Sequence, residues 1–247
     1  MQKGIKFRIY PNREQKNFIH QTLGCCRLIY NRGLAMRKES YEEGKKIGYT
    51  QTSAMLTELK RQEEFAFLKA ADSIALQQSL RDLDQSFVNF FQKRASYPTF
   101  KSKHNRFQSY RTVNQKDNIR IVGRYIKLPK LGFVKIRQSM EVGKINHVTI
   151  EYTPAGKYFA VLNVDFEPEP RPNAGGTIGI DVGIKAFYSD SNGNTVSNPR
   201  YLERAMRKLI REQRRLSRKQ KDSHNRGKQR LRVARAVSYT HLTLPTT

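Results

Sequence analysis

Six short stretches in which apolar residues recur at every second position follow one another in the middle of the chain. They cover residues 110–113, 119–122, 125–128, 133–137, 148–152 and 158–165. A period of two is typical of β-strands with one buried face. Short strands at this spacing, separated by Gly and Asn turns, favour a small antiparallel barrel. A further strand is expected over residues 5–10, with a basic and aromatic outer face.

Between this first strand and the barrel, apolar residues recur at helical spacing. Asn12 followed by Gln15 resembles a capping box, so a helix is expected to begin there. After a Gly-containing break, Thr52 or Ser53 is a plausible cap for a second helix, and Ser73 for a third. The chain therefore combines a helical segment with an antiparallel β-element.

A proline-spaced segment, residues 167–172, is the clearest domain boundary. After it, residues 177–185 alternate Ile and Val with Gly, Asp and Lys, which predicts a strand with one apolar face. On the other face Asp181 stands between Gly179 and Gly183, so no neighbouring side chain blocks a metal ion or a phosphate. Two-metal phosphodiester chemistry needs such a rigid carboxylate. The alternative is a solvent-facing Asp on a half-buried strand.

The remaining sequence predicts a hairpin and two basic helices. The Asn-Gly pair at residues 192–193 favours a tight turn, after which Thr195 and Val196 return as a strand. Pro199 can occupy the first turn of a long helix, and Ser223 can cap its continuation. Dense positive charge along both predicted helices is self-repelling unless an anion compensates it.

The charge of the whole chain points to a polyanionic partner. The sequence has 47 Lys and Arg against 21 Asp and Glu, which gives a formal net charge of +26. Nucleic acid is the favoured partner, because 12 Tyr and 13 Phe offer stacking surfaces for unpaired bases. A basic protein without such a partner, or one that binds anionic membranes, is the alternative. The candidate contacts are Lys6, Arg8, Tyr10, Arg27, Tyr30, Asn31, Arg32, Phe100, Lys101, Lys103, Arg111, Lys130, Arg214, Arg215, Arg218, Lys219, Asn225, Arg226 and Lys228.

The sequence shows neither an apolar run long enough to cross a membrane nor the apolar core of a signal peptide. A cytoplasmic protein without a membrane or small-molecule partner is therefore expected. The only cysteines, Cys25 and Cys26, are adjacent, where a mutual disulfide has poor geometry. Both are expected to be small buried side chains.

Several motifs, in order and over nearly all of the chain, resemble the TnpB (OrfB) family of transposon-encoded proteins, which are related to type V CRISPR effectors. They are KFRIYP at residues 6–11, the helix ending in paired Phe at 80–91, YPTFKSK at 97–103, LPKLG at 128–132, GIDVGIK at 179–185 and RRLSRK at 214–219. Ser223, Asn225, Arg226 and Lys228 continue the last motif.

The resemblance implies an α+β, multidomain chain. A wedge-like β-barrel would comprise residues 1–10 and 105–168, with a helical recognition insert at 11–104, which older descriptions call a helix-turn-helix. Residues 173–237 would form the first part of a RuvC-like nuclease domain of ribonuclease H type. The resemblance also implies guide RNA and target DNA as partners, Mg²⁺ as cofactor and Asp181 as its first ligand.

The sequence departs from the family after the basic helices. The second and third acidic residues and the four-cysteine zinc element of the family cannot be placed here. Residues 238–247 are expected to be a non-native tail, and a genuine short tail is the alternative. The sequence thus predicts an RNA-guided DNA endonuclease that is unable to cleave in this form. A nucleic-acid-binding protein without catalysis is the alternative, and an actin-like ATPase is a minor one.

Overall fold

The computed structural model describes residues 1–105, 107–137, 142–168 and 175–243, and the side chains up to residue 240. Residues 169–172 of the predicted linker and residues 244–247 of the predicted tail lie outside this part. The chain divides into two compact units. The first comprises residues 1–153 and 157–167, and the second comprises residues 154–156 and 168–247.

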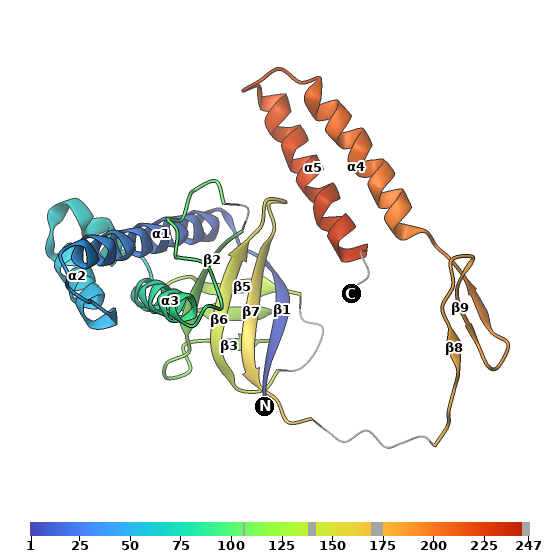
Figure 1. Cartoon of the computed structure of the whole chain (residues 1–247), viewed down its shortest axis with the longest axis horizontal. Helices are drawn as coiled ribbons and strands as arrows, with labels where there is room; N and C mark the ends of the chain where they lie inside the picture. The colour runs from blue at the N-terminus through green and yellow to red at the C-terminus, as the bar shows by residue number, and fades with distance from the viewer. Residues whose placement is uncertain (106, 138–141, 169–174, 244–247) are drawn as a thin grey trace. The chain divides into compact units, whose positions relative to one another are not determined.

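A seven-stranded antiparallel sheet forms the framework of the first unit (Figure 1). Its strands are β1 Gln2–Tyr10, β2 Gln108–Val113, β3 Arg120–Val122, β4 Tyr125–Leu128, β5 Gly132–Ile136, β6 Ile145–Tyr152 and β7 Tyr158–Asp165. Their order is β2-β6-β7-β1-β5-β4-β3. The long β1 pairs with β7 over most of its length and with β5 through Ile9 and Tyr10.

The sheet is open, so the predicted closed barrel is wrong. Within the described residues no ladder joins the two edge strands, β2 and β3. Instead, helix α3 (Ser73–Phe91) packs along β2, and Arg111 of β2 forms an ion pair with Asp82 of α3. A helix therefore covers the edge that a closing strand would occupy.

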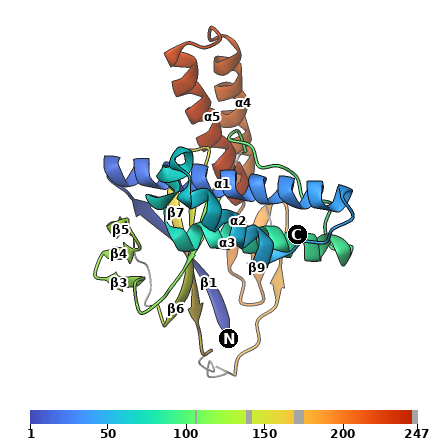
Figure 2. The same ribbon diagram turned by 90° about the vertical axis from the view of Figure 1, so that its left-hand side faces the viewer.

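Helices α1 (Arg13–Glu42), α2 (Tyr49–Arg61) and α3, with the short 3₁₀ helix η1 (Glu63–Lys69), pack together on the same side of the sheet, where α3 also runs along the edge strand β2 (Figures 1 and 2). Alternate strand residues such as Phe7 and Ile150 pack with helix residues such as Ile19 and Leu76 in one cluster. The predicted barrel and helical insert thus share a hydrophobic core, while their division into separate domains stays a prediction.

The helix caps show where the sequence interpretation holds. The capping box is confirmed, because Asn12 Oδ1 accepts a hydrogen bond from Gln15 N at 2.8 Å and Gln15 Oε1 accepts one from Asn12 N at 3.0 Å. The other two predicted caps are wrong. Gly48 caps α2, and Asp72 caps α3, where its carboxylate accepts from two backbone N–H groups.

The second unit contains a three-stranded sheet and two helices. Strands β8 (Ile180–Asp181), β9 (Ala186–Asp190) and β10 (Thr195–Ser197) pair antiparallel in the order β10-β9-β8. The predicted hairpin is therefore present. The predicted strand over residues 177–185 is too long: only two of its residues form a strand, and its Ile and Val side chains are exposed.

Helices α4 (Tyr201–Ser217) and α5 (His224–Thr243) pack against each other as a hairpin (Figure 1). Pro199 lies before α4, whose cap is Arg200 in the left-handed region at φ 46°, so the predicted helix start is wrong. Ser223 does cap α5, since its Oγ accepts a hydrogen bond from Arg226 N at 3.1 Å. Within the described residues, no helix is long and apolar enough to span a membrane.

Candidate nucleic-acid interface

Asp181 is the proposed metal ligand, and it lies exposed on β8 opposite Ser189 of β9. The nearest carboxylate on the same sheet, Asp190, faces Ile180 and therefore points to the other side of the sheet. Asp190 is already engaged: its carboxylate accepts from Asn194 Nδ2 at 2.8 Å, Asn194 N at 2.9 Å and Asn192 N at 3.0 Å. These bonds, those from Asn194 first, lower the pKa of Asp190. Asp190 closes the hairpin and does not assist Asp181.

The surroundings of Asp181 do not fit a two-metal centre. Among the described residues no group of three His, Cys, Asp or Glu side chains is placed to hold a metal ion. Mg²⁺ demands near-octahedral oxygen ligation, and one carboxylate cannot hold two such ions. Cys25 and Cys26 are buried, and burial raises the pKa of both thiols, so they stay protonated and inert.

The α4–α5 hairpin holds seven of the predicted contacts and is joined by buried polar bonds. Gln229 Nε2 donates to Glu212 Oε2 at 2.7 Å and to the Glu212 carbonyl at 3.1 Å. The Gln229 bond is the main reason that the pKa of Glu212 is lowered. Arg226 Nη1 donates to the Lys219 carbonyl at 2.8 Å, and Arg215 Nη1 lies 3.2 Å from Glu212. Arg226 therefore stabilises the hairpin turn, whereas the exposed Arg215 pairs with Glu212 within α4 alone.

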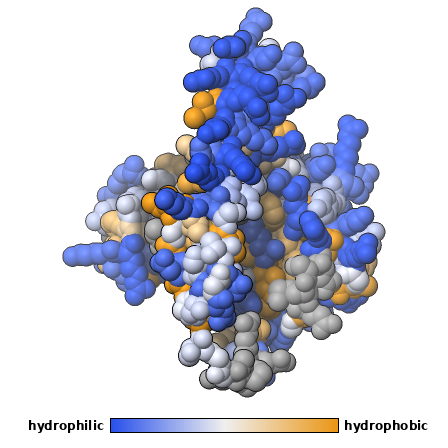
Figure 3. Space-filling model, turned by 90° about the vertical axis from the view of Figure 1, so that its right-hand side faces the viewer, coloured by the Kyte–Doolittle hydropathy of each residue, from blue (hydrophilic) through white to orange (hydrophobic). Residues whose placement is uncertain are grey.

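The other basic side chains of the hairpin project into solvent. Figure 3 shows a hydrophilic surface over these two helices in its upper part. The predicted contacts that are exposed here are Arg214, Arg215, Arg218, Lys219, Asn225 and Lys228. The hairpin thus presents dense positive charge on a scaffold that is fixed from inside, as a phosphate-binding surface requires.

In the first unit, the predicted basic loop is held by α1. Asn31 Nδ2 donates to the Lys101 carbonyl at 3.0 Å, and Lys101 N donates to Asn31 Oδ1 at 2.8 Å. The Lys101 ammonium lies 4.0 Å from the centre of the Tyr30 ring, where desolvation lowers the pKa of Lys101. Tyr30 is buried. Phe100 and Lys103 of the same loop remain exposed.

A cavity of about 220 Å³ lies between α1, α3, this loop and β2. It brings together three predicted contacts, Arg27, Lys101 and Arg111, with Asp82. Arg111 forms an ion pair with Asp82, so part of the positive charge in the cavity is already neutralised. Asp82 was not among the residues predicted from the sequence, although an acid on the helix facing a basic strand could have indicated this pair.

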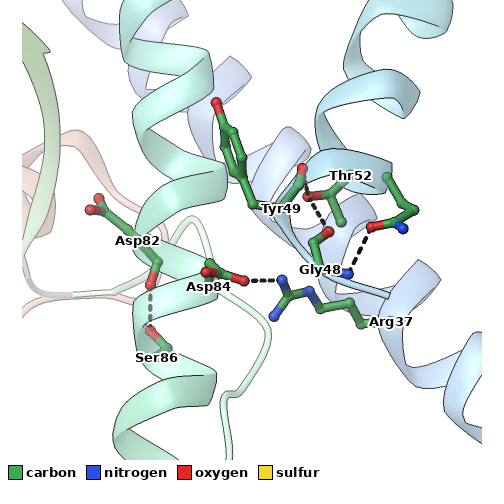
Figure 4. A network of polar contacts seen from close by, with 8 residues as sticks. Arg37, Gly48, Tyr49, Thr52, Asp82, Asp84 and Ser86 are labelled. Atoms are coloured by element: carbon green, nitrogen blue, oxygen red, sulfur yellow. Dashed lines mark hydrogen bonds and ion pairs between the residues drawn. The ribbon is translucent and has the colours of Figure 1, made fainter. Parts of the chain in front are cut away.

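A neighbouring polar network between α1, α2 and α3 was also missed (Figure 4). Arg37, which is buried on α1, forms an ion pair with Asp84 of α3. At the start of α2, Gly48 N donates to Gln51 Oε1 at 2.9 Å, and Thr52 Oγ1 donates to the Tyr49 carbonyl at 3.0 Å. The Arg37–Asp84 ion pair joins α1 to α3, and the two hydrogen bonds stabilise the first turn of α2.

Two further predicted contacts serve internal packing. The guanidinium of Arg32 lies 5.4 Å from the centre of the Phe65 ring of η1. Lys130 Nζ donates to the carbonyls of residues 69, 70 and 71 at 2.7, 3.3 and 2.9 Å. Lys130 therefore closes the end of η1.

The predicted outer face of β1 is confirmed as a basic and aromatic surface. Lys6 lies 4.7 Å and Arg8 5.8 Å from the centre of the Phe159 ring on β7. Arg8 also lies 5.4 Å from the ring of Tyr10, and Lys6 forms an ion pair with Glu151. The structure thus brings Lys6, Arg8 and Tyr10 together on one side of the sheet.

Two family models match the chain. One, described as "Helix-turn-helix domain" (HTH_OrfB_IS605), matches residues 1–46, and the other, "Probable transposase" (OrfB_IS605), matches residues 147–241. In the structure the residues matched by the first model form β1 and the single helix α1.

The chain is also similar to curated proteins. It is 36% identical over 239 residues to a "Putative RNA-guided DNA endonuclease" of Streptomyces pristinaespiralis, covering 95% of this chain and 59% of that protein. It is 34% identical over 242 residues to "Putative RNA-guided DNA endonuclease InsQ" of Escherichia coli (strain K12), covering 96% and 59%. The chain therefore spans about three fifths of the length of these relatives. A solved structure titled "Cryo-EM structure of CRISPR-Cas12f Ternary Complex" aligns with a TM-score of 0.36 at 12% identity, over 94% of this chain and 58% of that chain.

Proposed function

The chain belongs to the TnpB (OrfB) family, and on that premise we propose that it binds a guide RNA and its complementary DNA as part of an RNA-guided DNA endonuclease. The observation that carries the proposal is the sequence similarity to two proteins named as putative RNA-guided DNA endonucleases. The chain is 36% and 34% identical to them over nearly its whole length. The exposed cations of the α4–α5 hairpin support it, because they suit a phosphate backbone.

The finer architecture follows from the same premise. The seven-stranded sheet would be the wedge-like domain, α1 to α3 the recognition part, and residues 173–237 the beginning of a RuvC-like domain. In that domain Asp181 would be the first Mg²⁺ ligand. Its exposed position on β8, with a glycine two residues away on either side, supports this role.

Cleavage is not proposed for this chain alone. When bound between carboxylates, Mg²⁺ would stabilise the charge that develops during phosphodiester hydrolysis. The described residues offer Asp181 without a second carboxylate beside it, because Asp190 points away and closes the hairpin. This observation favours a second candidate function, nucleic-acid binding without catalysis, for the 247-residue chain.

The binding proposal is tested by filter binding of RNA and DNA at increasing salt. Because displaced counterions drive the association, affinity should fall ~10³-fold or more between 50 and 200 mM salt if six or more phosphates are contacted. Replacing the four exposed cations Arg214, Arg215, Arg218 and Lys219 with Gln should reduce the salt slope by up to about 3. An affinity that hardly changes over this salt range would contradict the proposal.

A matched control replaces four exposed cations elsewhere, Lys38, Lys45, Lys46 and Arg61, with Gln. This variant removes the same charge from the protein and leaves the hairpin intact. An equal reduction of the salt slope in both variants would show that net charge, and not the hairpin, determines binding.

A further inference from the structure

The outer face of the seven-stranded sheet carries aromatic rings and cations in register across β1, β5 and β4. Tyr10 of β1 pairs with Lys135 of β5, and Lys135 pairs with Tyr125 of β4. Directly opposed residues point to the same side of a sheet, so these three side chains form one row. Two residues from Lys135 along β5, Phe133 pairs with Lys127 of β4 and begins a second row.

The opposite face is the core, which fixes the orientation of both rows. Ile9, Ile126, Val134 and Ile136 alternate with the outer residues and are at most 3% exposed. Tyr10, Tyr125 and Phe133 are between 47 and 49% exposed, and their pairing places all three on the same outer face. A one-residue slip in register would bury these rings, so the fold itself holds them at the surface.

The three rings are far enough apart for each to stack with a separate planar group of one ligand. Tyr10 and Tyr125 lie two strands apart, which is about 10 Å, and Phe133 lies about 7 Å along β5 from the level of Lys135. Between and beside the rings stand Lys127, Lys135 and the guanidinium of Arg8, which lies 5.4 Å from the Tyr10 ring. Each ring therefore has a cation within its own or the neighbouring row.

We propose that this face, built on Arg8, Tyr10, Tyr125, Lys127, Phe133 and Lys135, binds an unpaired stretch of RNA by stacking its bases on the three rings. Every base has an apolar π-face, and stacking on aromatic side chains combined with backbone neutralisation is how unpaired strands are bound without sequence preference. The two rows carry two cations, Lys127 and Lys135, and no carboxylate, and Arg8 lies beside the Tyr10 ring, so the charge of this face complements a phosphate backbone. A duplex offers stacked, covered bases and is not bound by the rings.

The inference rests on the proposed function for the source of the RNA, namely the guide. It goes beyond that function, because it assigns the unpaired bases to three rings on one sheet face. The basic helices α4 and α5 are not part of it. The two proposals can therefore fail separately.

The test measures binding of the full 247-residue chain to an unpaired 12-nucleotide RNA and to an RNA hairpin duplex of the same charge. The variant replaces Tyr10, Tyr125 and Phe133 with Leu, which keeps apolar surface and removes the rings. Affinity for the unpaired RNA should fall at least 10-fold, since each stacked base contributes about 5- to 150-fold. The salt slope and the duplex affinity should stay unchanged, because no cation is removed.

Two controls separate the rings from other effects. Tyr41→Leu removes a more exposed ring at the end of α1, outside the two rows, and should leave both affinities unchanged. In the unchanged protein, 4-thiouridine in the unpaired RNA should crosslink to peptides that contain Tyr10, Tyr125 or Phe133. This measurement does not depend on the folding of a variant.

The proposal is overturned if the triple variant loses affinity for unpaired RNA and for duplex equally, or if it loses affinity for neither. It is also overturned if Tyr41→Leu has the same effect as the triple variant. Crosslinks confined to other peptides would also overturn it. Equal behaviour with unpaired DNA of the same sequence would overturn the assignment to RNA. Failure of the unchanged protein to bind any nucleic acid would instead contradict the proposed function.

Discussion

The ion pair between Arg37 and Asp84 (Figure 4) allows a quantitative prediction, because its two partners are buried to different degrees. The Arg37 side chain is 8% exposed, whereas the Asp84 side chain is 41% exposed. The guanidinium also lies 4.8 Å from the centre of the Phe87 ring. Removing the acid therefore leaves a buried charge without its partner, while removing the base leaves a carboxylate that water reaches.

The expected costs follow from this asymmetry. Asp84→Ala should lower the stability of the first unit by about 3 kcal/mol, the lower end for an uncompensated buried charge. Arg37→Met should cost only about 1 kcal/mol, since the methionine keeps the apolar contact with Phe87 and Asp84 remains hydrated. The double variant should cost less than the sum of the two, because the partners interact directly.

Native-state hydrogen exchange of α1 and α3 amides is the suitable assay, because a chain of two units need not unfold in one step. The exposed pair Arg61–Glu58, 2.8 Å apart on α2, provides the control, and Arg61→Gln should cost less than about 0.5 kcal/mol. Equal costs for Asp84→Ala and Arg37→Met, or a larger cost for the latter, would refute the reasoning.

Three further predictions concern single residues. Gly33→Ala should destabilise the first unit by about 1–3 kcal/mol, because its Cβ would lie 2.9 Å from Leu80 Cδ2, whereas Gly24→Ala has room and should be neutral or stabilising in urea unfolding. Because hydrogen bonds lower the pKa of Asp190, its contribution to the β9–β10 hairpin should be constant above about pH 4 and be lost as pH falls through the lowered pKa, which amide exchange would show. Asp181→Ala should alter neither the circular dichroism nor the RNA affinity of this chain, and a tenfold loss in filter binding would contradict that expectation.

The strands could be predicted well because their signal is local. The predicted bounds of β4 and β7 agree with the structure. Strand β6 begins three residues earlier than predicted, at Ile145. The sequence pattern did not reveal this start, because the register shifts between Ile145 and His147 and interrupts the period of two. Closure of the sheet could not be predicted, since it depends on whether a strand or a helix covers β2.

The alternation at residues 177–185 shows the limit of such a pattern. Alternation reports which side chains could share an apolar face, but a strand also needs a hydrogen-bonded partner along its length. Only Ile180 and Asp181 face β9, so the strand ends with them. The hairpin turn, in contrast, was predictable because the Asn-Gly pair encodes it locally, and Gly193 has the left-handed φ of 83° that such turns favour.

Charge alone could not distinguish binding residues from structural ones, whereas the structure separates the two groups by their contacts. Lys130 and Arg226 donate to main-chain carbonyls, and Asn31 holds the backbone of the basic loop. A lysine that closes a helix end and a lysine that meets a phosphate look alike in a sequence, because both need only a cation near an oxygen. Substituting the first group should therefore change stability and nucleic-acid affinity together. Substituting exposed cations such as Arg214 and Lys228 should change the salt slope at constant stability, and this separation identifies the interface.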